Sequence, residues 1–120
     1  MVNRLLEHWD YPAHLSQDIR VSIHSTIPIA KGMASSTADI AATAVATAQH
    51  LGHQLDESTL AQLCVSLEPT DSTVFQQLTL FDHNDASTQI PCDAQPALDL
   101  LVLESPQTLR TADYHRIPRQ

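Results

Sequence analysis

The junction at residues 28–38, Pro-Ile-Ala-Lys-Gly-Met-Ala-Ser-Ser-Thr-Ala, constrains the fold more than any other stretch of this sequence. Residues 20–27 before it alternate β-branched and polar side chains, which is typical of a half-buried strand. Residues 39–51 after it are rich in alanine, the residue with the highest helix propensity. The sequence therefore predicts a strand, then a loop over 28–34, here called the glycine loop, and then a helix over about 35–51.

A loop in this position is suited to binding an anion. The first turn of a helix leaves backbone N–H groups without partners and carries the positive end of the helix dipole. Small side chains let a phosphate group approach the backbone closely. The order Lys31–Gly32 excludes a Walker P-loop, which requires Gly-Lys-Ser/Thr at the start of the helix. A phosphate cradle is the functional interpretation, and an ordinary strand-to-helix loop with a serine N-cap is the structural alternative.

The charge of the chain narrows the classes of partner. Its 120 residues carry a formal net charge of −8 and are enough for one domain with a modest core. This charge argues against the backbone of a nucleic acid or an anionic membrane surface as a partner. A bound nucleotide would need local positive charge or a metal ion, and Lys31 beside the glycine of the loop can supply positive charge.

The cysteines and the hydropathy pattern predict a cytoplasmic protein. Cys64 and Cys92 are far apart and form no CxxC pair, which favours free thiols in a reducing compartment over a disulfide framework. Residues 1–9 are amphipathic and lack the apolar core of a signal peptide. No stretch reaches the roughly 20 apolar residues of a membrane span. We therefore expect neither secretion nor membrane insertion.

Further helices and strands are expected on both sides of the alanine-rich helix. Apolar spacing predicts a short helix over residues 2–9 and another over 57–67, with Asp56 as the N-cap of the second. Gly52 is expected to end the alanine-rich helix as its C′ residue. Beyond residue 70 the pattern changes to short β-like segments. They lie at residues 73–81, 88–90 and 98–103, with a turn at 82–85.

Two carboxylates, Glu68 and Asp71, follow the helix predicted over 57–67 and lie beside several hydroxyls. Phosphoryl transfer to an alcohol needs a ligand for magnesium and often a group that orients or deprotonates the accepting hydroxyl. Glu68 and the hydroxyl of Ser36 would suffice for Mg²⁺, which keeps several of its waters. Asp71 would then act on the acceptor hydroxyl. The structural alternative is an exposed glutamate and an Asp-Ser turn at the end of a helix.

The junction resembles the second motif of the GHMP kinases, a superfamily that includes galactokinase, homoserine kinase and mevalonate kinase. That motif reads Pro-x-x-x-Gly-[Leu/Met]-x-Ser-Ser-[small]-Ala. Its specified positions are matched here by Pro28, Gly32, Met33, Ser35, Ser36, Thr37 and Ala38. Residues 27–44 and 64–75 together resemble one branch, the L-threonine kinases of cobalamin assembly, as do residues 78–83 and 101–106. The resemblance extends over the whole of residues 1–120.

The resemblance implies an α+β fold of the ribosomal protein S5 domain 2 type and a role for each site residue. ATP and Mg²⁺ would be bound, and free L-threonine would be phosphorylated to O-phospho-L-threonine for the linker of the cobalamin nucleotide loop. Asp71 matches the acceptor-side aspartate, and Ser36 and Glu68 match the magnesium ligands. The ATP phosphate-binding residues would be Lys31, Gly32, Met33, Ala34, Ser35, Ser36 and Thr37. The role of Lys31 among them is inferred from its charge.

Two motifs of the GHMP kinases, an N-terminal strand motif and a glycine-rich motif near the C-terminus, have no match in this chain. We therefore expect residues 1–120 to form a single partial domain from the central part of such a kinase. Two alternatives stay open: a kinase for homoserine or another small amino alcohol, and a non-catalytic remnant that binds only a nucleotide or a partner. The edge of the strand predicted at 98–103 would favour self-association.

Overall fold

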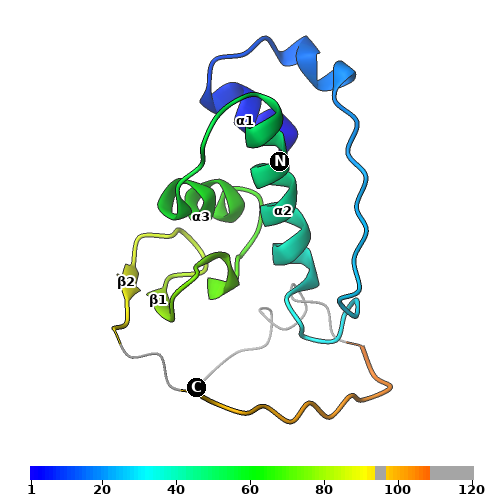
Figure 1. Ribbon diagram of the computed structural model, residues 1–120, viewed down its shortest axis with the longest axis vertical. Coiled ribbons are helices and arrows are strands. Elements are labelled where there is room, and N and C mark those ends of the chain that lie inside the picture. Colours follow the sequence, from blue (N-terminus) through cyan, green and yellow to red (C-terminus); the bar gives the residue numbers. More distant parts are fainter. Residues whose placement is uncertain (94–96, 109–120) are drawn as a thin grey trace.

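The computed structural model describes residues 1–93 and 97–108, which form an α+β arrangement of helices and one small sheet (Figure 1). The helices are α1 (Val2–His8), η1 (Ala13–Asp18), α2 (Ser35–His50), α3 (Glu57–Val65) and η2 (Ser72–Val74), where η denotes a 3₁₀-helix. The strands are β1 (Thr79–Phe81) and β2 (Gln89–Pro91). Among the described residues, no helix combines the length and the apolar character needed to cross a membrane.

Helix α2 forms the centre of the core and contacts both α1 and α3 (Figure 1). The buried cluster takes Leu5 from α1, Ala44 from α2, and Leu60 and Cys64 from α3. Alanine on α2 lets the neighbouring helices approach closely, because its side chain adds little volume between them. Helix α2 therefore packs against both neighbours, although Val45 on it remains exposed.

Helix α2 ends at the residue that the sequence singles out. Gly52 has a left-handed backbone conformation, with φ of 79°, just beyond the helix. Its N–H donates a hydrogen bond to the carbonyl of Gln49 at 3.1 Å, and the N–H of His53 donates to the carbonyl of Ala48 at 2.8 Å. These two bonds form a Schellman motif, which satisfies carbonyls that the helix leaves free. The predicted C′ role of Gly52 is therefore confirmed.

Asp56 begins α3, as predicted. Its carboxylate accepts a hydrogen bond from the N–H of Thr59 at 2.7 Å. Hydrogen bonding from Thr59 favours the charged form and so lowers the pKa of the Asp56 carboxyl. The helix ends at Val65, two residues before the predicted end, and the Ser66 hydroxyl donates to the carbonyl of Leu63 at 2.6 Å. A serine hydroxyl that satisfies a terminal carbonyl in this way competes with continuation of the helix.

The strand predicted over residues 20–27 is wrong. The segment is extended and runs beside α2 to the glycine loop, but no described segment pairs with it in a sheet (Figure 1). Side chains of its expected inner face, Val21 and Ile23, are exposed. Alternation in the sequence indicates which side chains share a face. A strand also needs a neighbouring segment to satisfy its backbone groups, and alternation does not supply that neighbour.

The β-like segments of the second half are shorter than predicted. Residues 73–81 begin in η2 and reach strand conformation only in β1. The strand predicted at 88–90 is confirmed as β2, with a shift of one residue, and it pairs antiparallel with β1 so that Leu80 lies opposite Ile90. The turn predicted at 82–85 is also confirmed.

Residues 98–103, predicted as a strand, form no strand in the part of the chain that the structure describes. Their aliphatic side chains are exposed, that of Leu100 by 86%. The segment crosses the bottom of the view in Figure 1 and then turns up toward the glycine loop. High β propensity is realised only against a partner edge, and no described strand offers one here.

Candidate functional site

The glycine loop has an unusual backbone. Ala30, Gly32 and Ala34 all have positive φ values, of 59°, 71° and 57°. Glycine adopts this region freely, whereas each alanine there costs roughly 1–2 kcal/mol. Left-handed residues within a loop help to form the concave arrangements of N–H groups that bind anions. The loop therefore has the backbone character that its sequence predicted.

Helix α2 begins immediately after the glycine loop, with Ala34 as its N-cap. Alanine has no side-chain oxygen, and no side chain among the described residues caps this N-terminus. The N–H groups of the first turn are therefore left to a ligand or to water. The alternative of an ordinary serine N-cap is not what the structure shows.

Two hydroxyls of the first turn of α2 contact two carboxylates of the segment after α3, residues 68–71, here called the carboxylate loop. The Ser36 hydroxyl donates a hydrogen bond to the Glu68 carboxylate. The Thr37 hydroxyl donates to Asp71 Oδ2 at 3.4 Å and accepts from the Asp71 N–H at 3.3 Å. The paired residues are 32 and 34 positions apart in the chain. The fold thus unites residues that the sequence offered as two separate clusters.

The carboxylate loop is anchored by Thr70, which is almost fully buried. The Thr70 N–H donates to the carbonyl of His83 at 3.0 Å, and its hydroxyl donates to the carbonyl of Glu68 at 3.0 Å. Glu68 is half-buried and Asp71 is exposed, so both carboxylates remain accessible from solvent. In the sequence Thr70 is only one hydroxyl between two acids. Its burial depends on contacts with residues distant in the chain, so the local sequence does not predict it.

Cys64 adjoins the carboxylate loop from the core side of α3. Its carbonyl accepts a hydrogen bond from the N–H of Glu68 at 3.2 Å. Burial raises the pKa of the Cys64 thiol to about 11, and the negative charge of Glu68 adds to this shift. The thiol is therefore protonated at neutral pH and belongs to the packing of the core rather than to the reactive groups.

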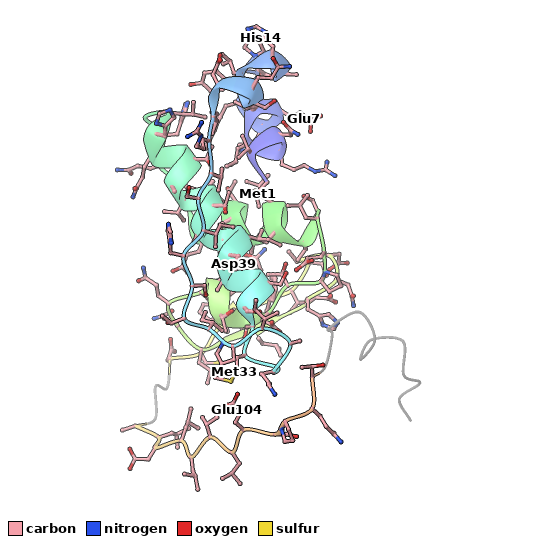
Figure 2. The ribbon with its side chains drawn as sticks, turned by 90° about the vertical axis from the view of Figure 1, so that its right-hand side faces the viewer. Met1, Glu7, His14, Met33, Asp39 and Glu104 are labelled. Atoms are coloured by element: carbon pink, nitrogen blue, oxygen red, sulfur yellow. The ribbon has the colours of Figure 1, made fainter. Side chains whose placement is uncertain are left out.

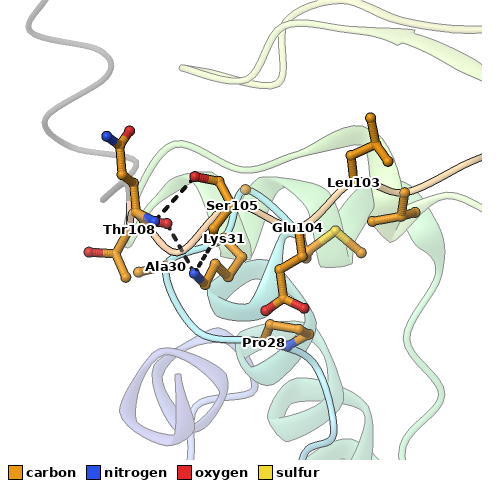
Figure 3. Close-up of a pocket in the computed structure, with 11 residues that line it drawn as sticks. Pro28, Ala30, Lys31, Leu103, Glu104, Ser105 and Thr108 are labelled. Atoms are coloured by element: carbon orange, nitrogen blue, oxygen red, sulfur yellow. Dashed lines mark hydrogen bonds between the residues drawn. The ribbon is translucent and has the colours of Figure 1, made fainter.

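A cavity of about 400 Å³ lies between the glycine loop and residues 102–108 (Figure 3). Met33 and Leu103 give its wall an apolar part, and Glu104 adds a carboxylate. Figure 2 shows Met33 and Glu104 close together where the loop faces this segment. The segment was not part of the predicted site, because a contact between such distant parts of the chain leaves no periodic signal in the sequence.

Lys31 bridges the two walls of this cavity. Its ammonium group donates to the carbonyl of Ser105 and, at 3.1 Å, to the carbonyl of Gln107 (Figure 3). Within residues 1–93 and 97–108, neither a hydrogen bond nor an ion pair joins Lys31 to the carboxylate loop. An ammonium group has three donors, and within the described residues two of them are used by these carbonyls. The structure therefore brings Lys31 to the edge of the cavity rather than to Glu68 and Asp71.

The oxygens at the first turn of α2 suit a metal ion that is only partly held by protein. The described residues contain no group of three or more His, Cys, Asp or Glu side chains that could hold a metal. Ser36 and Glu68 offer two hard oxygen atoms side by side. Mg²⁺ favours such ligands and commonly takes the others from water and from substrate phosphates. This donor set fits a magnesium–nucleotide complex.

Two curated proteins that are similar to this chain are L-threonine kinases. The L-threonine kinase of Citrobacter freundii is 84% identical over 119 residues, which are 99% of this chain and 41% of that relative. The L-threonine kinase of Salmonella typhimurium strain LT2 is 77% identical over 120 residues, which are 100% of this chain and 40% of that relative. The chain thus spans about two fifths of the length of the curated relatives it matches. No solved structure matches it significantly.

The family of the chain follows from its first two thirds. Residues 1–76, which include the glycine loop, α2 and the carboxylate loop, match the family described as "GHMP kinases N terminal domain". The predicted resemblance to GHMP kinases, and to L-threonine kinases among them, is confirmed. The chain belongs to the GHMP kinase family.

Proposed function

We propose that this chain forms part of an ATP-dependent L-threonine kinase, which converts L-threonine to O-phospho-L-threonine. The observation that carries the proposal is the pairing of Ser36 with Glu68 and of Thr37 with Asp71 at the uncapped start of α2. A helix N-terminus open to phosphate, next to two carboxylates, has the groups that phosphoryl transfer to a hydroxyl requires. The names of the two relatives support L-threonine as the acceptor.

The phosphates of ATP would bind where the glycine loop meets α2, at residues 31–37. Backbone N–H groups of the first turn and the positive end of the helix dipole supply the attraction. Lys31 adds local positive charge to a chain whose net charge is −8, and it lies within the glycine loop at the edge of the cavity. Phosphate binding by the backbone does not require the side-chain hydroxyls of Ser36 and Thr37.

Magnesium would be held by the Ser36 hydroxyl and the Glu68 carboxylate, which already lie in contact. When bound, Mg²⁺ neutralises the negative charge that develops on the transferred phosphoryl group. The Ser36 hydroxyl donates to Glu68 in this structure, so the two oxygens would turn from each other to the ion.

Asp71 would position the acceptor. Its exposed carboxylate lies against the first turn of α2, where the phosphates are expected. There it accepts a hydrogen bond from the hydroxyl of L-threonine and orients that oxygen toward the γ-phosphorus. As the new P–O bond forms and the bond to ADP breaks, the hydroxyl proton passes to the carboxylate.

We also propose the fold of this part of the kinase. The helices and the small sheet would form one partial domain, residues 1–120, of the ribosomal protein S5 domain 2 type. Such a kinase would work in the cytoplasm and supply the linker of the cobalamin nucleotide loop.

The exposed aliphatic side chains of residues 98–103 support self-association, since unpaired apolar segments of high β propensity tend to pair between chains. A strict monomer in size-exclusion chromatography at high concentration would contradict this part.

The test is a calorimetric titration of the chain with a magnesium–ATP analogue, without and with L-threonine, followed by an assay of threonine-dependent ADP release. Saturable nucleotide binding that L-threonine strengthens, together with turnover, is the expected result. Homoserine and other amino alcohols serve as matched acceptors, and faster turnover with one of them would reassign the substrate. A folded chain that binds neither ligand would favour the non-catalytic alternative.

A further inference from the structure

We infer that Thr37 is a positioning residue, whose hydroxyl holds the Asp71 carboxylate in place for the acceptor. The catalytic part of this inference rests on the proposed function, whereas the contact between the two side chains does not. Two groups of Thr37 then have separate roles. Its backbone N–H belongs to the phosphate-binding turn, and its side-chain hydroxyl holds the Asp71 carboxylate.

The burial of Thr37 sets it apart from the two serines before it. Thr37 is 4% exposed, whereas Ser35 is half-buried and Ser36 is exposed. A buried hydroxyl in a native structure is almost always hydrogen-bonded. Among the described residues the Thr37 hydroxyl bonds to Asp71 alone, once as donor to Oδ2 and once as acceptor from the N–H.

This pair of bonds fixes Asp71 at two points. The bond from the N–H holds the main chain at the start of η2, and the bond to Oδ2 holds the side chain. The Asp71 carboxylate makes no N-cap hydrogen bond to η2, and Thr37 is its one hydrogen-bond partner among the described residues. Without Thr37, an exposed aspartate would lose the contact that selects its rotamer.

The geometry leaves one carboxylate oxygen for chemistry. Thr37 occupies Oδ2, so Oδ1 keeps its lone pairs for the hydroxyl of the acceptor. Threonine is also a stiff residue in a helix, because its β-branch restricts χ1. A hydroxyl on a stiff, buried side chain can hold its partner with little motion, and small displacements of a reacting group have large effects on rate.

The contact can be tested without any assay of activity. Thr37→Val removes the hydroxyl but keeps the shape, and Thr37→Ser restores a hydroxyl. Thr47→Val is the matched control, since Thr47 is also 4% exposed and lies in the same helix. Hydrogen exchange of the Asp71 amide, followed by NMR, is expected to accelerate about tenfold in Thr37→Val, because the Thr37 oxygen is its acceptor. The Thr37→Ser and Thr47→Val variants are expected to resemble the unsubstituted chain, and unchanged exchange in Thr37→Val would overturn the contact.

Turnover tests the positioning role. Thr37→Val is expected to lower kcat about 10-fold to 100-fold with the KM for ATP within about twofold, and Thr37→Ser is expected to recover most of the loss. If Thr37 acts through Asp71, Thr37→Val has no further effect in an Asp71→Asn background. Independent, multiplying losses would overturn the inference, as would a change confined to KM for ATP. Lack of turnover in the unsubstituted chain would favour the non-catalytic alternative, and the exchange data would still decide the contact.

Discussion

The first turn of α2 and residues 98–103 differ in whether their side chains are bonded to, or buried against, the rest of the molecule. The first turn carries small polar residues, and Ser36 and Thr37 bond to partners 32 and 34 positions away. Residues 98–103 carry five large aliphatic side chains, and all five are exposed. Apolar character drives burial only where another surface can receive it. In this chain the small polar residues of this turn therefore make specific long-range contacts, whereas the side chains of its most hydrophobic run stay exposed.

The largest expected effect comes from removing the negative charge of Asp71. Asp71→Asn keeps the shape of the side chain but removes the acceptor for the threonine proton, so kcat for threonine-dependent ADP release is expected to fall about 10²- to 10⁴-fold. Asp99→Asn in the exposed segment is the control and is expected to leave kcat unchanged. Nucleotide affinity by calorimetry should change little in either variant. Full turnover in Asp71→Asn would remove this residue from the proposed mechanism.

The next effect contrasts two leucines. Leu5 is fully buried against α2, whereas Leu100 is 86% exposed. Leu5→Ala is expected to lower the free energy of unfolding by about 2–5 kcal/mol, because it leaves a cavity in the core. Leu100→Ala is expected to change it by less than about 0.5 kcal/mol. Urea unfolding followed by circular dichroism measures both, and a large loss in Leu100→Ala would show that residues 98–103 are covered in solution.

The two cysteines are expected to differ in their reactivity. The pKa of Cys64 is raised to about 11 by burial, whereas Cys92 is only half-buried. At pH 8 a thiol with that pKa is about 0.1% thiolate, so Cys64 should be alkylated about 100-fold more slowly than an ordinary thiol. Timed iodoacetamide labelling with peptide mapping checks this, and urea should abolish the protection. Similar rates at both cysteines in the native chain would contradict the burial of α3.

The smallest effect is the dependence of α3 on pH. Asp56 caps this helix, and hydrogen bonding from Thr59 lowers its pKa in the folded state. A lowered folded-state pKa means that the cap stabilises the fold above the ordinary value of about 3.9 and loses that effect as the pH falls further. The gap in urea midpoint between the chain and Asp56→Ala should therefore be larger at pH 7 than at pH 3. A gap that widens in acid would contradict the capping role.

Local signals in the sequence predicted the α-helices well, but not the two 3₁₀-helices η1 and η2. Alanine-rich composition located α2, Gly52 marked its end, and Asp56 marked the start of α3, because each feature acts within a few residues. The strands predicted at 20–27 and 98–103 failed, since pairing depends on a distant segment that local alternation cannot specify.

The residue types of the candidate site were visible in the sequence, whereas the contacts between them were not. The need for a magnesium ligand and a base suggested Glu68, Asp71 and Ser36 from residue types alone. Thr37 contacts Asp71, and Lys31 reaches the carbonyls of Ser105 and Gln107. Both contacts depend on how the chain folds back on itself. No spacing in the sequence encodes those distances.

Under the proposed function, the positive φ values of Ala30 and Ala34 would also affect the thermodynamics of nucleotide binding. The fold holds these two alanines in a conformation that an unstructured loop would rarely visit. The entropy of ordering the loop is then lost during folding, before any nucleotide arrives. Binding would therefore cost less conformational entropy than it would with a mobile loop. Glycine at either position would relieve the backbone strain but raise the conformational entropy of the unfolded chain, and that entropic cost would fall on folding.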